Sequence, residues 1–235
     1  MVSAAAGGAQ SVGFAVAAWT AWLPGRAALL SGGAVAAVPA PAGLKRRATP
    51  LGRKVLEAAW PLLADHGDSP RIVLSSRHGE YQRTLGLARA LAAEEELSPA
   101  EFSLSIHHGL AALLSIATGN RAGHTAVAAG GDTFGWGCVE AAACLADGDG
   151  SVLLLHFDEP LPAEYRDIAD AEEAALVLAL LLRPAGGDSV RLEFEPAAAP
   201  SGDDPALRFG EMLAGGDAAA EATGERMTWR WRHAA

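Results

Sequence analysis

The sequence predicts a layered α/β fold with an abbreviated second half. Apolar strand-like runs alternate with segments of helical period across residues 1–160, which favours a doubly wound sheet with helices on both faces. The remaining residues instead predict strand, strand, helix and strand. Half of the 235 residues are apolar, enough for one large domain or a domain and a half. We expect residues 1–165 to form one unit and residues 166–235 to complete the same fold.

The individual elements follow from hydrophobic spacing and turn residues. In the first unit we expect strands at 12–22, 71–75, 124–129 and 151–157, and helices at 50–65 (bent at Pro61), 81–96, 106–118 and 134–146. Residues 23–43 predict a loop, and Ser98-Pro99-Ala100-Glu101 predicts a capped short helix. The second unit predicts strands at 174–182, 190–195 and 227–233 and a helix at 205–213.

Composition and charge exclude several classes of function. The net charge is −10, and residues 101–235 alone carry −13, which argues against a nucleic-acid partner. The apolar run Ala174 to Leu182 is too short to span a membrane. No basic residue precedes Arg26, which argues against a secretory signal. We expect a soluble, cytoplasmic protein.

One basic cluster stands out in the first half of the chain. It consists of Lys45, Arg46, Arg47, Arg53 and Lys54. A solvated surface loop is the plainer interpretation, and a dock for an acidic partner is the sharper one.

Metal and cofactor motifs are missing from the sequence. Cys138 and Cys144 lie six residues apart on a predicted helix, away from metal or disulfide spacing, and are interpreted as buried small apolar groups. His107 and His108 are adjacent and point about 100° apart on a helix, so they cannot chelate together. The glycine-rich run 130–137 fits neither the dinucleotide fingerprint nor the P-loop. We expect no metal and no cofactor.

The segment 124–146 predicts a strand, a sharp turn and a helix. Enzymes often place a nucleophile on such a turn. Here the turn is Gly130-Gly131-Asp132-Thr133, which contains neither cysteine nor serine. Asp132 at the helix N-terminus is interpreted first as a cap and second as a carboxylate that blocks an oxyanion site.

Several segments, taken in order, resemble a known family. They are VGFAVAAWTAWLPG, LSSRHGEYQRTLGLARAL, LSPAEFSLSIHHGLAALLSIATG, AAGGDTFGWGCVEAAACLADG and VLLLHFDEPLPAEY. Together they resemble the short β-ketoacyl-synthase-like chain length factors of aryl polyene-type fatty acid and polyketide machinery. The resemblance implies a thiolase-like α/β/α fold.

Within that resemblance the catalytic machinery is incomplete. Aligned through Arg121 and the strand 125–129, the catalytic cysteine of a condensing enzyme falls on Gly131. Cys138 lies about 10 Å further along the helix, too far to replace it. The two catalytic histidines of the family's second half also lack counterparts, because His233 is the one histidine after His156.

The resemblance implies a catalytically silent subunit that pairs with an active β-ketoacyl synthase and helps to shape its acyl tunnel. The pairing strand is then His124, Thr125, Ala126, Val127, Ala128 and Ala129. This run contains no proline and no lysine to block an edge, so it suits strand pairing. An acyl carrier protein is the implied transient partner, with the basic cluster as a possible dock.

Two other functions stay open at this stage. A thiolase-like acyltransferase or hydrolase would use Ser75, Ser76, His78 and Glu80, which follow a buried strand. A homodimeric acyl-binding module is the third possibility.

Overall fold

The structure is a computed structural model that describes residues 3–4, 9–35, 37–63, 69–165, 174–187 and 189–234. Its strands are β1 (Ser3–Ala4), β2 (Gln10–Trp22), β3 (Leu30–Gly33), β4 (Arg71–Ser75), β5 (His124–Val127), β6 (Val152–Asp158), β7 (Leu176–Pro184), β8 (Ser189–Pro196), β9 (Ala219–Thr223) and β10 (Met227–His233). Its helices are α1 (Ala42–Lys45), α2 (Pro50–Leu63), α3 (Tyr81–Ala92), α4 (Pro99–Leu104), α5 (Gly109–Thr118), α6 (Thr133–Ala146) and α7 (Pro205–Gly215), with a 3₁₀ turn at Ala163–Tyr165.

One mixed sheet of ten strands organises the described chain. Its order is β5-β4-β6-β7-β2-β8-β10-β9, and β1 and β3 pair with β2 beside this path. The pairs β5–β4 and β4–β6 are parallel, whereas the pairs from β6 to β9 are antiparallel. The doubly wound arrangement expected for the first part is therefore confined to β4, β5 and β6. Strands β7 to β10 join the same sheet, and the division at residue 165 stays a prediction.

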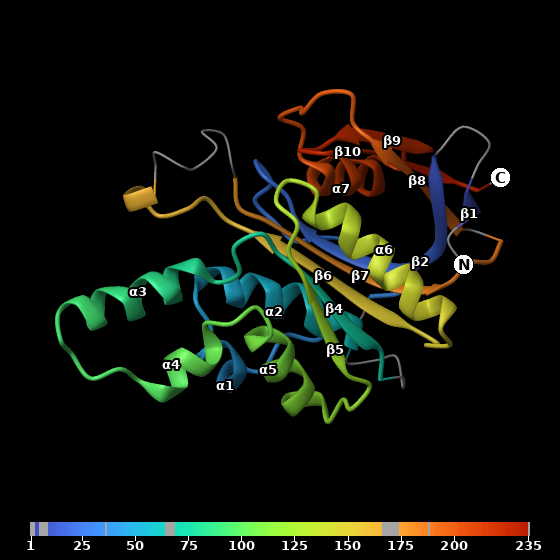
Figure 1. Cartoon of the computed structure of the whole chain (residues 1–235). Helices are drawn as coiled ribbons and strands as arrows, with labels where there is room; N and C mark the ends of the chain where they lie inside the picture. Colours follow the sequence, from blue (N-terminus) through green and yellow to red (C-terminus); the bar gives the residue numbers. More distant parts are fainter. Residues whose placement is uncertain are drawn as a thin grey trace.

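Helices cover both faces of the sheet, which confirms the layered α/β/α architecture (Figure 1). Helices α2 and α5 pack on one face, where Leu56, Leu62 and Leu114 meet Ile72 and Leu153. Helices α6 and α7 pack on the opposite face. Apolar residues alternate along the central strands to supply both layers, so the whole of β7 from Leu176 to Leu182 is buried.

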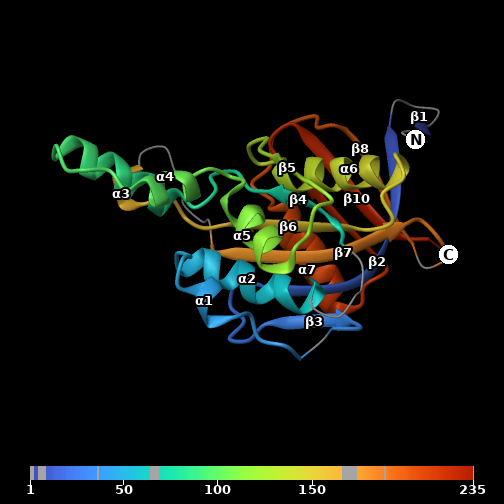
Figure 2. The ribbon, with the colours of Figure 1, turned by 90° about the horizontal axis from the view of Figure 1, so that it is seen from below.

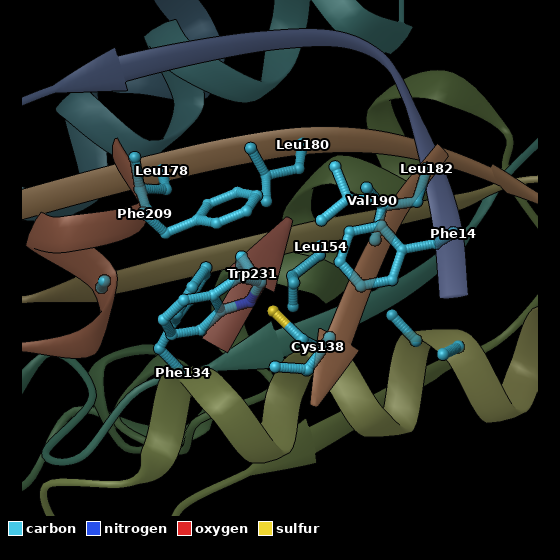
Figure 3. Close-up of a cluster of buried hydrophobic side chains, with 14 of the residues drawn as sticks. Phe14, Phe134, Cys138, Leu154, Leu178, Leu180, Leu182, Val190, Phe209 and Trp231 are labelled. Atoms are coloured by element: carbon cyan, nitrogen blue, oxygen red, sulfur yellow. The ribbon is translucent and has the colours of Figure 1, made fainter. Parts of the chain in front are cut away.

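The second apolar layer is rich in aromatic rings. Phe134 of α6 lies between Phe209 of α7 and Trp231 of β10, with ring centroids 5.4 and 5.9 Å apart. Figure 3 shows these rings converging beneath the sheet with Phe14 and the leucines of β7. Helix α6, which follows the glycine-rich turn, is thereby fixed against the core.

Helices α3 and α4 differ from the other helices because they project beyond the strand ends, on the side where β4 ends (Figure 2). The capping sequence predicted for α4 is confirmed: Ser98 is the N-cap and accepts a hydrogen bond from the Glu101 N–H at 3.3 Å. Helix α3 ends at Ala92 rather than at residue 96.

Some expected boundaries were wrong. The predicted loop 23–43 contains β3 and the start of α1, because Leu30–Gly33 pairs antiparallel with β2. The helix expected from Ile106 begins at Gly109, after a turn. Strand β9 was not expected, because its sequence AAEAT carries no strong strand signal. Within the described ranges, no helix combines the length and apolarity needed to cross a bilayer.

Candidate functional site

The turn between β5 and α6 has the strand–turn–helix shape expected from the sequence. Gly130 adopts φ 61, a left-handed conformation that glycine accepts without steric cost. The Thr133 hydroxyl donates to the Gly130 carbonyl at 2.7 Å and accepts from the Ala129 N–H at 2.8 Å. Residues 130–133 thus form a closed turn, which we call the elbow.

Asp132 occupies the N-cap position of α6, but its side chain does not cap the helix, so the preferred interpretation of this side chain was wrong. Its side chain makes no capping hydrogen bond and is buried, with 1% of its surface exposed. Oδ2 accepts from the Arg226 backbone N–H at 2.7 Å, and Oδ1 accepts from the Trp229 indole N–H at 2.9 Å. The carboxylate therefore ties the elbow to the β9–β10 hairpin, because its partners there outcompete the local N–H groups.

Glu225, in the turn between β9 and β10, lies over the elbow. Its Oε2 accepts a hydrogen bond from the Gly131 N–H at 3.2 Å. A Cβ atom at Gly131 would lie 3.4 Å from the Glu225 Cβ, an ordinary contact, whereas one at Gly130 would overlap the Glu225 carboxylate. The space at Gly131 therefore permits a side chain. The Gly131 N–H, which could stabilise an oxyanion next to a nucleophile at this position, is instead bonded to the Glu225 carboxylate. No local signal could reveal this contact, since the partners are 94 residues apart.

Cys138 does not provide a substitute nucleophile. It lies on α6 with no exposed surface, and its sulfur points into the aromatic layer beside Trp231 (Figure 3). Burial raises the pKa of the Cys138 thiol far above its ordinary range, so the thiolate is absent at neutral pH. The sequence-based interpretation of this cysteine as a buried apolar group is confirmed. Cys144 is half-buried, and burial raises its pKa as well.

Strand β5 forms the edge of the sheet. It pairs in parallel with β4, with His124 opposite Ile72 and Val127 opposite Ser75, and no described strand pairs with its other side. His124 and Ala128 are exposed. The strand ends at Val127, two residues earlier than expected, because Ala129 turns to bridge Gly131. This side of β5 is therefore open among the described strands, and the interface itself stays a prediction.

Strand β5 has a histidine pair on its α5 side and a groove on its α6 side. On the α5 side, the Nδ1 atoms of His108 and His124 lie 2.8 Å apart, so one ring donates and the other accepts. Burial, followed by the charges of His124 and His107, lowers the pKa of His108 and favours its neutral form. On the α6 side lies an open groove, which is lined by Val127, Ala129, Trp136, Val139, Glu140, Arg226 and Met227.

Ser75 and Ser76 are buried at the carboxyl end of β4. The Ser75 Oγ lies 3.1 Å from the Thr133 carbonyl and 2.9 Å from His156 Nδ1, so this hydroxyl supports the first turn of α6. The Ser76 hydroxyl donates to Asp158 at 3.0 Å. Burial lowers the pKa of His156. His156 and Asp158 lie within the last three residues of β6, and polar residues at the end of an apolar run are a usable sequence signal.

His78 and Glu80 point to different surroundings. The His78 backbone N–H donates to Asp158 at 3.2 Å, and its ring lies edge-on to Tyr81. The Glu80 carboxylate instead bonds to the Thr49 hydroxyl and lies 3.8 Å from Arg83. Burial raises the pKa of Glu80. Ser76 and Glu80 therefore bond to different partners and do not form one hydrogen-bonded catalytic triad with His78.

The basic cluster lies on α1, the turn after it and the first turns of α2, not in a loop. Lys45 pairs with Glu57 at 3.1 Å, and the Lys54 ammonium lies 5.6 Å from the centre of the Trp22 ring. Arg46, Arg47, Arg53 and Lys54 are exposed. Within the described residues, no group of three or more histidine, cysteine or acidic side chains is arranged to hold a metal ion.

Comparisons with known proteins now identify the family. Residues 19–232 match the family described as β-ketoacyl synthase, N-terminal domain. A solved complex of the ketosynthase ApeO with its chain length factor ApeC, from Xenorhabdus doucetiae, contains a chain with 24% identity and a TM-score of 0.79, and the match covers 93% of this chain and 98% of that one.

Two further structures share the fold at lower similarity. The ishigamide ketosynthase/chain length factor has 16% identity and a TM-score of 0.58, with 80% of this chain and 68% of that chain covered. The AntDE:AntF complex, described as a type II polyketide synthase acyl carrier protein with its ketosynthase bound to the hexaketide, has 13% identity, a TM-score of 0.56 and coverages of 81% and 70%. No curated protein matches the sequence significantly. The chain therefore has the thiolase-like fold and belongs to the β-ketoacyl synthase family.

Proposed function

We propose that this chain is a catalytically silent ketosynthase-like subunit, a chain length factor, which pairs with an active β-ketoacyl synthase and helps to shape the acyl tunnel. The substrates would be acyl chains of a fatty acid or aryl polyene-type polyketide system. The chain itself would need no cofactor and no metal.

The main support for this proposal is that the elbow lacks a nucleophile and that its Gly131 N–H is already hydrogen-bonded. A condensing enzyme needs a thiolate at the turn and free N–H groups to stabilise the oxyanion. Here the aligned position is Gly131, its N–H is bonded to Glu225, and the buried thiol of Cys138 is directed into the core. The same turn keeps its shape through Thr133 and its anchor through Asp132, which supports a structural role for the elbow.

The open edge at β5 supports the proposed pairing with a ketosynthase subunit. Extended backbone with unpaired N–H and C=O groups favours addition of another strand. The half-buried Thr125, Ala126 and Val127 offer small side chains that permit close approach. Two of the similar structures contain a ketosynthase together with a chain length factor. We infer that residues 124–129 pair with the partner's equivalent strand.

The exposed cations at the start of α2 suit a weaker, transient contact. Arg46, Arg47, Arg53 and Lys54 form a positive face on a chain of net charge −10. An acyl carrier protein with an acidic surface is the partner that we assign to it. Its affinity should fall with rising salt, because exposed charges are screened.

Co-expression with a full-length, active β-ketoacyl synthase from the same organism tests the proposed function. We expect a stable 1:1 complex that condenses acyl groups, and loss of condensation when this chain is omitted. The isolated chain, incubated with an acyl thioester, should show no acyl adduct by intact mass. Acyl transfer or hydrolysis by the isolated chain, abolished by His78→Ala, would instead establish the enzyme alternative.

A further inference from the structure

The segment from α3 to α5 carries most of the exposed large apolar side chains of the described structure. Six such side chains are exposed, and five lie in this segment: Leu91, Leu97, Phe102, Ile106 and Ile116. The sixth is Val38. Exposed apolar side chains that gather in one segment mark an interaction surface more often than scattered ones. We call residues 81–104 the arm, because α3 and α4 project together from the sheet (Figure 2).

The arm is fastened to the rest of the chain at its base. The Arg83 guanidinium is buried, donates to the Arg47 carbonyl at 2.9 Å and pairs with Glu101 of α4. Beyond this point α3 has little support, since Arg83 and Leu85 are its two buried residues. A helix of 12 residues is marginal in water unless an amphipathic face packs against something. The distal half of α3 is held by half-buried Leu87 and Ala90 and by an ion pair between Arg89 and Glu164, whereas its outer face, which carries Leu91, is exposed.

The end of α3 holds an unusual backbone conformation. Glu94 has φ 54, and it is the one non-glycine residue with positive φ among those that the structure describes. The Glu94 N–H bonds to the Leu91 carbonyl at 3.1 Å and the Glu95 N–H bonds to the Ala90 carbonyl at 2.9 Å, the pattern of a helix end that glycine normally completes. A glutamate is strained there, because a side chain in the left-handed region crowds the backbone.

The tip of the arm is acidic as well as apolar. Glu94, Glu95 and Glu96 are exposed, and within the described ranges none of the three pairs with a cation. Leu91 and Leu97 lie on either side of them, with 66% and 36% of their surfaces exposed. This combination fits a protein surface where basic residues border an apolar strip. It does not fit an acidic carrier protein, which the three carboxylates would repel.

The apolar segment continues to the open edge of the sheet. His108 at the N-terminus of α5 contacts His124 of β5, and α4 packs on α5. Ile116, the most exposed large apolar residue of the described chain at 78%, lies in the last turn of α5. A subunit that pairs with β5 would therefore lie next to α5, and the arm extends from the same helical layer.

We propose that the arm is a second docking element, which clasps the same ketosynthase subunit that pairs with β5. Leu91 and Leu97 supply the apolar contact, and the carboxylates of 94–96 meet basic side chains of the partner. This inference rests on the proposed function, because it takes the ketosynthase as occupant.

Binding measurements on purified proteins test the arm. The probe is the full-length β-ketoacyl synthase used for co-expression, titrated against the full chain. One variant is Leu91→Ser/Leu97→Ser, and another is Glu94→Gly. We expect the double variant to raise the dissociation constant by on the order of tenfold or more, because the two leucine side chains would no longer be buried against the partner. Val38→Ser, an exposed apolar residue outside the arm, is the matched control and should leave it unchanged.

The glutamate variant separates docking from stability. Glu94→Gly relieves the left-handed strain and should raise the melting temperature of the isolated chain. It also removes a docking carboxylate, so affinity for the ketosynthase should fall severalfold, more at low salt than at high salt. Opposite directions for stability and affinity are the signature of the proposed role.

The possible results distinguish the two proposals. No complex with wild-type chain would overturn the proposed function. A complex whose affinity is the same for the arm variants and Val38→Ser would leave the function standing and overturn the arm. Self-association of the wild-type chain that the arm variants abolish would assign the arm to a second copy of this chain and would also overturn the inference.

Discussion

Replacing Asp132 with alanine should destabilise the fold by about 3 kcal/mol. The carboxylate is buried and is the acceptor for the Arg226 N–H at 2.7 Å and the Trp229 indole N–H at 2.9 Å. Trp229 has no exposed surface, so its donor would find no water. Each buried donor left without an acceptor costs about 1–3 kcal/mol, and hydrogen bonds to a charged group lie toward the upper part of that range. Asp132→Asn keeps one acceptor oxygen and should lose about half as much.

Urea denaturation followed by circular dichroism measures the difference. A loss of about 3 kcal/mol corresponds to a midpoint lower by about 1–1.5 M urea, since the denaturant slope is about 2–3 kcal/mol per molar for a chain of this size. Asp147→Ala, at the exposed opposite end of α6, is the control and should stay within about 0.5 kcal/mol of wild type. If Asp132→Ala also stays within that range, the tie between elbow and hairpin is not a stabilising contact.

Three further changes test the elbow and the core around it. Gly131→Cys should give a thiol that reacts slowly with iodoacetamide at pH 7, and Gly131→Cys/Glu225→Ala should react on the order of tenfold faster, because removing the adjacent carboxylate lowers the thiol pKa. Gly135→Ala should cost at least about 1–3 kcal/mol in urea unfolding, because the new methyl group would overlap a buried indole, whereas Gly86→Ala on the open side of α3 should stabilise by up to about 1 kcal/mol. Burial lowers the pKa of His156, so the stability that its neutral form contributes is complete above about pH 6.5 and is lost as the pH falls, which predicts a lower melting temperature at pH 5.5 than at pH 7.5.

Each of these three predictions has a control result that would contradict it. Equal labelling rates with and without Glu225 would show that its carboxylate does not govern the elbow. Equal costs at Gly135 and Gly86 would mean that helix propensity outweighs packing. For the pH effect, His156→Gln should reduce the dependence and His233→Gln, at an exposed position, should not. The same pH profile in both variants would contradict the assignment.

Local chemistry explains which features the sequence could predict. Strand β4 follows from the apolar run Ile72 to Leu74, and the cap at Ser98 follows from residues within one turn. The elbow at 130–133 follows from its glycines. In each case the partners that decide the structure are close in the sequence.

The features that the sequence could not predict depend on distant partners. The Asp132 carboxylate is held by residues 226 and 229, and the Gly131 N–H is held by Glu225. The local sequence around Asp132 therefore predicted a helix cap, because these distant partners were not visible in it. The Ala-rich β9 forms because β10 offers it a ladder, not because of its own propensity. The open arm could not be inferred either, since the apolar period of α3 is also what a buried helix would show.

The strand order separates the parts of this protein in time as well as in space. Strands β5, β4 and β6 are neighbours, and all three have been synthesised once residue 158 is made. Strand β2, nearly the first to be made, lies between β7 and β8 and gains both neighbours after residue 196. Pairings across such long stretches of chain form slowly and leave apolar strands uncovered meanwhile. The edge that would receive a partner can thus be assembled on the ribosome before the centre of its own sheet is closed.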